Sequence, residues 1–148
     1  MNKEKEINRR KFIEKSGKIA TAGVLFNVLP STSTAKSFEG EIKVVVIGCG
    51  GRGTGAAHQA ILADPDVRIV ALADVFKDQA QACYENLLNR YGNSRQLKVN
   101  EETIFVGFDS YKNAIDMADV VILTTPPGFR PLHFEYAVEK NKKVFMEK

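Results

Sequence analysis

The sequence predicts an α/β protein with a doubly wound parallel sheet, and three observations carry this prediction. Residues 42–47, IKVVVI, form an apolar and mostly β-branched run that is typical of a strand buried on both faces. A glycine-rich stretch, residues 48–53, ends this run, and a helix-like stretch follows. Strand-like and helix-like segments then alternate as β-α-β-α-β-α-β-α-β. Right-handed crossovers turn that order into a parallel sheet with helices on both faces.

The glycine-rich stretch reads Gly-Cys-Gly-Gly-Arg-Gly, which is a G-x-G-x-x-G pattern. Gly48 allows the tight turn, Gly50 lets the backbone approach a pyrophosphate, and Gly53 permits close packing of the helix on the strand. The helix N-terminus then presents unpaired N–H groups to the phosphates. The pattern predicts a Rossmann dinucleotide-binding domain, with Cys49 and Gly51 among the cofactor-binding residues. The alternative is a glycine-rich turn without a ligand.

An acidic residue follows the second predicted strand, residues 67–73. Asp74 lies 21 residues after Gly53 and 26 after Gly48. This is close to the spacing of the acid that accepts hydrogen bonds from the adenosine ribose hydroxyls. A carboxylate there favours NAD over NADP, because it repels a 2′-phosphate. Asp74 is also a candidate N-cap of the next helix, and the two roles can coexist.

Two helices are predicted around this second strand. Residues 56–63 are rich in small side chains and predict a helix that ends at residues 64–66, Asp-Pro-Asp. The later helix has one apolar face and stops at Gly92. That face consists of Ala80, Cys83, Tyr84, Leu87, Leu88 and Tyr91. Residues 93–102 then form a polar loop.

The second half continues the alternation. We predict a strand at 103–107, a short helix from Asp109 or Ser110 to Met117, a strand at 120–124, a helix at 132–139 and a strand at 142–146. In the helix at 132–139, Phe134, Ala137 and Val138 are predicted to face inward. The turn at 125–128 follows a strand at the carboxyl edge of the sheet, where ligands of α/β proteins bind.

Charge is distributed unevenly along the 148 residues. Residues 1–35 contain seven Lys/Arg and three Asp/Glu, whereas residues 36–148 contain fourteen and fifteen. The basic excess therefore lies outside the globular part, and no nucleic-acid partner is predicted. The two cysteines, Cys49 and Cys83, lack the spacing of metal ligands and are predicted to be free thiols. No metal site is predicted.

Residues 1–35 are predicted to be a signal peptide, and residues 36–148 a Rossmann domain. Arg9 and Arg10 are followed by Lys11 and an apolar pair, which resembles the twin-arginine export motif. The apolar stretch at 19–29 is too short and too polar to span a bilayer, so stable membrane insertion is not predicted. We expect export, for example to the periplasm, by a route that carries folded proteins. A disordered tail or an uncleaved anchor is the alternative.

Three segments together resemble the glucose–fructose oxidoreductase/inositol dehydrogenase (Gfo/Idh/MocA) family. They are residues 47–53 (IGCGGRG), 71–74 (ALAD) and 125–148, which contain a Thr-Pro turn, His133 and a terminal Glu-Lys. The resemblance implies that this is the nucleotide-binding half of a two-domain protein. The family's second α/β domain is missing, so we expect the chain to be truncated at its C-terminus.

The resemblance also implies roles for individual residues. Lys148 matches the family lysine beside the nicotinamide, where it would orient the reacting hydroxyl or help to remove its proton. Glu147 would contact the nicotinamide ribose. The adenosine side would be contacted by Thr124, Thr125 and Pro126.

Two residues of this region have less definite roles. Arg52, at the start of the first helix, is a candidate partner of the pyrophosphate charge or a solvated surface arginine. His133 is expected to pack or to support other residues rather than to act as a catalyst.

The function implied by the resemblance is an exported NAD(H)-dependent oxidoreductase of a sugar or polyol, which forms a homo-oligomer at full length. An NAD-dependent glycosidase of the same superfamily is the alternative within the family. Retention of the Glu147-Lys148 pair slightly favours the oxidoreductase. A methyltransferase would be expected to have a denser glycine pattern and to lack the Thr-Pro and Glu-Lys segments. A non-catalytic NAD-binding fragment is the third possibility.

Overall fold

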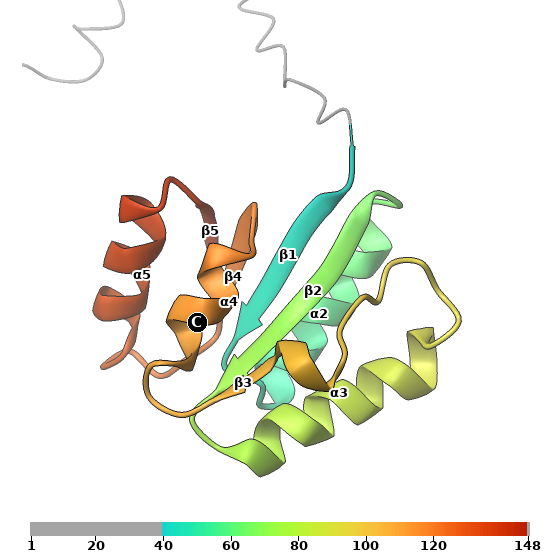
Figure 1. Ribbon diagram of the computed structural model, residues 1–148, viewed down its shortest axis with the longest axis horizontal. Coiled ribbons are helices and arrows are strands. Elements are labelled where there is room, and N and C mark those ends of the chain that lie inside the picture. The colour runs from blue at the N-terminus through green and yellow to red at the C-terminus, as the bar shows by residue number, and fades with distance from the viewer. Residues whose placement is uncertain (1–39, 148) are drawn as a thin grey trace, which may run out of the picture. The chain divides into compact units, whose positions relative to one another are not determined.

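The computed structural model describes residues 40–147, which contain a five-stranded parallel sheet (Figure 1). The strand order is β3-β2-β1-β4-β5. The strands are β1 (Ile42–Ile47), β2 (Val67–Asp74), β3 (Ile104–Val106), β4 (Val120–Leu123) and β5 (Lys143–Met146). Every pairing is parallel, and β1 is central, between β2 and β4. The predicted parallel α/β fold is confirmed.

Helices cover both faces of this sheet (Figure 1). They are α2 (Gly51–Ala63), α3 (Lys77–Tyr91), α4 (Ser110–Asp116) and α5 (Arg130–Glu139), and a short 3-10 helix, η1, spans Glu101–Thr103. One buried cluster joins α2 and α3 to one face of the sheet, and a second cluster joins α4 and α5 to the other. Alternate residues of β1 serve the two clusters: Val44 and Val46 enter the first, Val45 and Ile47 the second. The sheet is therefore doubly wound, as predicted.

Two helices begin earlier than the sequence pattern predicts. α2 begins at Gly51 rather than at residue 56, because the glycine-rich stretch itself forms the first helical turn. α5 begins at Arg130 rather than at residue 132, with Pro131 in its first turn. Proline is well tolerated there, because first-turn N–H groups have no partner within the helix. The start of α2 matters most, since it places helical N–H groups directly after the turn.

The apolar faces predicted for α3 and α5 are partly wrong. Leu88 of α3 is 43% exposed, and Phe134 and Val138 of α5 are 41% and 51% exposed. In α5 the buried residues are His133 and Ala137, which lie four residues apart on one stripe. A helix that packs on a sheet through one narrow stripe buries only the residues on that stripe. Apolar character alone therefore overestimates how much of these helices is covered.

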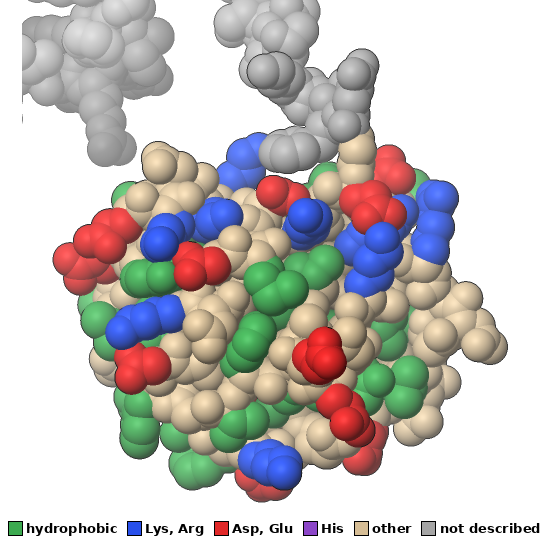
Figure 2. Space-filling view, viewed as in Figure 1, with side chains coloured by type: hydrophobic (Ala, Val, Ile, Leu, Met, Phe, Trp, Pro, Cys, Tyr) green, Lys and Arg blue, Asp and Glu red, His purple; other side chains and the backbone are tan. Residues whose placement is uncertain are grey.

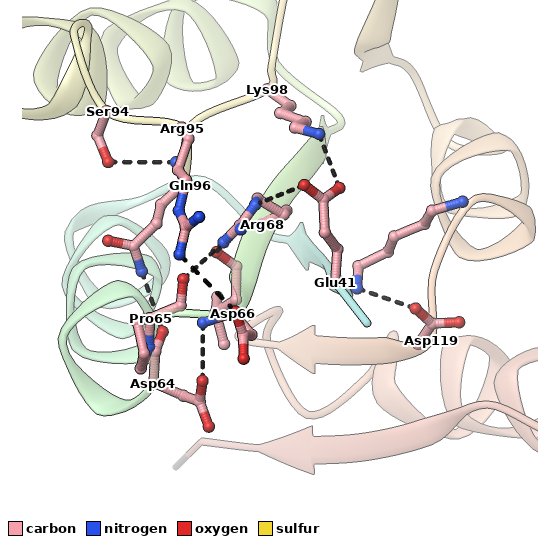
Figure 3. Close-up of polar contacts among 12 residues, drawn as sticks. Glu41, Asp64, Pro65, Asp66, Arg68, Ser94, Arg95, Gln96, Lys98 and Asp119 are labelled. Atoms are coloured by element: carbon pink, nitrogen blue, oxygen red, sulfur yellow. Dashed lines mark hydrogen bonds and ion pairs between the residues drawn. The ribbon is translucent and has the colours of Figure 1, made fainter. Parts of the chain in front are cut away.

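A polar network holds the amino end of the sheet (Figure 3). Arg68 of β2 is only 2% exposed, and its guanidinium donates to Glu41 Oε1 at 3.1 Å and to the Pro65 carbonyl oxygen at 2.7 Å. Lys98 donates to the other Glu41 oxygen at 2.7 Å. The hydrogen bond from Lys98, and then that from Arg68, lower the pKa of the Glu41 carboxyl. This network joins the start of β1 to β2 at the edge of the sheet away from the glycine turn.

The surface is of mixed charge. On the face drawn in Figure 2, basic and acidic side chains are interspersed, with hydrophobic side chains between them. Such mixing gives no field of a single sign on that face. Within residues 40–147, no helix is long and apolar enough to cross a bilayer. The same part of the chain contains no group of three or more side chains that could hold a metal ion.

Candidate cofactor site

A cavity of about 400 Å³ opens at the carboxyl ends of β1, β2 and β4. These ends meet where the strand order reverses direction from β1, which is the place where open α/β sheets bind ligands. Of the residues predicted from the sequence to form the site, those that line the cavity are Gly48, Gly50, Asp74, Thr124, Thr125 and Pro126. Residues far apart in the sequence are thus brought together around one space.

The three glycines of the pattern between β1 and α2 differ in the space around them. Gly48 has a φ of 94°, and a Cβ there would lie 2.9 Å from the Thr125 nitrogen. A Cβ on Gly53 would lie only 1.9 Å from the Gly48 carbonyl oxygen. Gly50 differs, because a Cβ there would meet no atom within 4 Å. Gly48 and Gly53 are required by the turn itself, whereas Gly50 leaves open space on the cavity side.

Asp74 is fixed at the end of β2 by the backbone around it. Its Oδ2 accepts a hydrogen bond from the Cys49 N–H at 2.6 Å, and its Oδ1 accepts one from the Phe76 N–H at 2.9 Å. The N-cap of α3 is Phe76, so the interpretation of Asp74 as the N-cap is wrong. The carboxylate instead ties the glycine turn to the loop after β2. Each oxygen has a further lone pair for a ribose hydroxyl.

The residues after β4 support the same turn from the other side. The Thr124 hydroxyl lies 2.5 Å from the Gly48 carbonyl oxygen and 3.1 Å from that of Ile47, so its proton is donated to the turn. The Thr125 side chain is buried, and its carbonyl oxygen accepts a hydrogen bond from Arg130 Nε at 2.7 Å. Thr124 therefore holds the glycine turn in place, while Thr125 and Pro126 form part of the cavity wall.

An aromatic wall lines the cavity, and the sequence pattern did not predict it. His133 is 5% exposed; its ring centroid lies 4.4 Å from that of Tyr111 and 6.2 Å from that of Phe129. Phe129 lies 6.3 Å from Phe108. His133 Nδ1 is 3.3 Å from the Thr125 hydroxyl, and burial lowers the pKa of the imidazole. These rings come from two separate segments, one at the start of α4 and one at the start of α5, so no local pattern indicates that they meet.

Two predicted site residues pair with each other outside the cavity lining. Arg52 Nη2 lies 3.2 Å from Glu147 Oε2, with side chains 65% and 21% exposed. Arg52 is the second residue of α2, and Glu147 directly follows β5. Gly51, the first residue of α2, is exposed. The predicted lysine, Lys148, lies outside the described residues.

Cys49 and Cys83 are free and buried. The Cys49 thiol donates to the Ala73 carbonyl oxygen at 3.5 Å. The contact with Cys83, together with burial, raises the pKa of Cys49. The Cys49 thiol is therefore protonated, and the residue's contribution to the turn is its N–H bond to Asp74.

A dinucleotide fits this arrangement on three grounds. Gly50 leaves room for the close approach of a pyrophosphate. The N-terminus of α2 has no side-chain cap and no acidic residue in its own first turn, so no side chain of that turn occupies its N–H groups. Asp74 presents a carboxylate at the cavity edge. The arrangement can therefore hold phosphate and ribose groups at once.

Comparison with known proteins agrees with this geometry. Residues 42–148 match the family described as "Oxidoreductase family, NAD-binding Rossmann fold", with the short name GFO_IDH_MocA. The chain belongs to this family of NAD-binding oxidoreductases. The predicted family resemblance and the NAD-binding fold are thereby confirmed. No curated protein matches the chain.

Solved structures show the same fold. Scyllo-inositol dehydrogenase from Lactobacillus casei, with bound NAD(H) and scyllo-inositol, is 25% identical with a TM-score of 0.55. The match covers 73% of this chain and 28% of that protein. The WlbA dehydrogenase from Bordetella pertussis, in complex with NADH and UDP-GlcNAcA, is 19% identical over 73% of this chain and 29% of that one, with a TM-score of 0.50. The chain thus spans under a third of the length of these relatives.

Proposed function

We propose that this chain is the NAD-binding part of an oxidoreductase that acts on a sugar or polyol. The observation that carries the proposal is the Asp74 carboxylate, held by two backbone N–H groups at the edge of a cavity that Gly50 leaves open. Family membership supports the oxidoreductase class. The 25% identical neighbour with NAD(H) and scyllo-inositol supports a polyhydroxylated substrate.

Different residues of this chain would bind different parts of the dinucleotide. The open backbone at Gly50 and the first-turn N–H groups of α2 would receive the pyrophosphate. Asp74 would accept hydrogen bonds from the adenosine ribose, and its charge would oppose a 2′-phosphate. Thr125 and Pro126 would line the adenosine side. Thr124 would act indirectly, because its hydroxyl is already committed to the turn.

The chemistry would take place at the carboxyl end of β5. The bound nicotinamide supplies the acceptor or donor of a hydride. Glu147 would contact the nicotinamide ribose, and Lys148 would orient the substrate hydroxyl or take its proton. A free lysine has a pKa of about 10.4, so Lys148 would need burial or a positive neighbour to act as a base near neutral pH.

Titration with NAD and NADP tests the cofactor assignment. We expect the parent chain to bind NAD at least about tenfold more tightly than NADP, because a hydrogen bond to a charged group such as Asp74 contributes about 1.5–3 kcal/mol. Asp74→Asn should weaken NAD binding and narrow this preference, since it keeps the shape and removes the charge. Asp78→Asn is the matched control, an exposed acid in the first turn of α3. Equal affinity of the parent for both cofactors would contradict the proposal.

We propose further that the protein is exported through its first 35 residues, which lie outside the described part of the chain. The support is the Arg9-Arg10 pair and the apolar stretch that follows it. Replacing both arginines with lysine should leave the precursor in the cytoplasm, because the motif depends on arginine rather than on charge alone. A variant with Lys15→Arg and Lys18→Arg is the control. Unchanged localisation of the Arg9→Lys/Arg10→Lys variant in cell fractions would refute the export proposal.

A further inference from the structure

The ion pair between Arg52 and Glu147 lies outside the lining of the candidate cofactor site. Arg52 lies in the first turn of α2, directly after the glycine turn. Glu147 follows β5, and its backbone N–H donates to the Leu123 carbonyl oxygen at 3.1 Å, which fixes its position beside the end of β4. The pair therefore connects the phosphate-binding end of α2 with the segment predicted to lie at the nicotinamide.

The direction of the Arg52 side chain bears on its role. Among the described residues that line the cavity are Gly48 and Gly50, but neither Arg52 nor Glu147. The Arg52 guanidinium instead lies 3.2 Å from the Glu147 carboxylate. The cavity lining therefore does not distinguish the two roles of Arg52, and the contact with Glu147 is the observation that favours one of them. The observed contact directs it along the sheet edge toward β5.

The stability of the fold does not account for the ion pair between Arg52 and Glu147. Arg52 is 65% exposed, and exposed ion pairs contribute little to the free energy of unfolding. The Glu147 carboxylate is less exposed, at 21%, and its Oε2 is the atom that the Arg52 guanidinium contacts. The consequence of the contact is thus orientation of the Glu147 side chain.

We propose that Arg52 is a positioning residue for Glu147 and does not neutralise the pyrophosphate. It holds the Glu147 carboxylate in the orientation that receives the hydroxyls of the nicotinamide-side ribose. The first-turn N–H groups of α2 serve the phosphates without it. This inference rests on the proposed function, because it requires a dinucleotide in the cavity.

Three ligands separate the two roles of Arg52 in binding experiments on the full chain. ADP contains the adenosine and both phosphates, ADP-ribose adds the distal ribose, and NAD adds the nicotinamide. With Arg52→Gln we expect ADP-ribose and NAD to bind about fivefold more weakly, as for loss of one oriented hydrogen bond, and ADP to change less than about twofold. Glu147→Gln should give the same pattern with a loss at least as large, because it alters the group that contacts the ribose. The double variant should bind no more weakly than Glu147→Gln alone, because Arg52 acts only through Glu147.

A matched control and the opposing outcomes complete the test. Arg95→Gln removes an exposed arginine whose ion pair with Asp66 lies at the amino end of the sheet, and it should leave all three affinities unchanged. An equal loss for ADP, ADP-ribose and NAD with Arg52→Gln would overturn the inference and make Arg52 a pyrophosphate partner. If Glu147→Gln bound ADP and ADP-ribose as tightly as the parent does, the inference about Arg52 would also be overturned, but the proposed nucleotide site would not be. Failure of the parent to bind any of the three would refute the proposed function itself.

Discussion

A single methyl group on Gly53 tests the structural account of the glycine turn. In Gly53→Ala, the new Cβ would lie 1.9 Å from the Gly48 carbonyl oxygen and 2.9 Å from the Thr124 hydroxyl oxygen. The first of these atoms is backbone, so it cannot move aside as the end of a flexible side chain can. Gly48 itself is held at a φ of 94°, with the Thr125 backbone against it. The helix and the turn must therefore separate.

The magnitude follows from two opposing effects. Alanine in place of glycine in a helix stabilises by about 0.5–1 kcal/mol. Overpacking costs typically 1–3 kcal/mol, and a backbone contact as short as this belongs at the upper end of that range. We expect Gly53→Ala to lower the free energy of unfolding by about 2 kcal/mol, with a fall in Tm of roughly 10 °C for a domain of this size. NAD affinity should fall as well, because the turn that receives the pyrophosphate is displaced.

Gly55 supplies the matched control within the same helix. A Cβ there would meet no atom within 4 Å, so Gly55→Ala should stabilise by about 0.5–1 kcal/mol. Urea unfolding followed by circular dichroism measures both variants against the parent. The two substitutions are chemically identical and are expected to have opposite signs. If Gly53→Ala were as stable as Gly55→Ala, the close approach of α2 to the turn would be refuted.

Two further predictions concern the amino end of the sheet and the aromatic wall. Glu41→Gln should lower the urea midpoint more than Arg68→Met does, although Glu41→Gln is the smaller chemical change. The reason is that Glu41→Gln leaves the Arg68 guanidinium, which is 2% exposed, without its carboxylate partner. The reverse order of the two midpoints would argue against a charge-dependent network. Because burial lowers the pKa of His133 below its usual 6.5, the folded protein resists its protonation. Stability should be retained above pH 6.5 and fall as the pH drops from 6.5 toward the lowered pKa. His133→Gln should flatten this part of the pH profile, and a profile unchanged by His133→Gln would show that another group titrates.

Local sequence patterns predicted the fold for a clear physical reason. A strand buried on both faces must be apolar at successive positions, and residues 42–47 meet this requirement wherever the rest of the chain lies. The glycine requirement at Gly48 and Gly53 is likewise imposed by atoms of the turn and its immediate neighbours. Asp74 was predicted from its spacing to the glycine turn, because a strand, helix and strand of ordinary length bring that position to the same edge of the sheet as the turn.

Other properties of the site depend on which elements pack together, and only the tertiary structure decides them. Thr124 reaches a carbonyl 76 residues earlier in the chain, and Arg52 meets Glu147 across the sheet edge. The exposure of Phe134, against the inward position predicted for it, follows from the narrow stripe through which α5 touches the sheet. The sequence by itself determined the strands, the turn and the acid at the end of β2, because neighbours in the chain impose them. Hydrogen-bond partners and burial were decided by packing, because they join groups whose separation in the sequence carries no information about their distance in space.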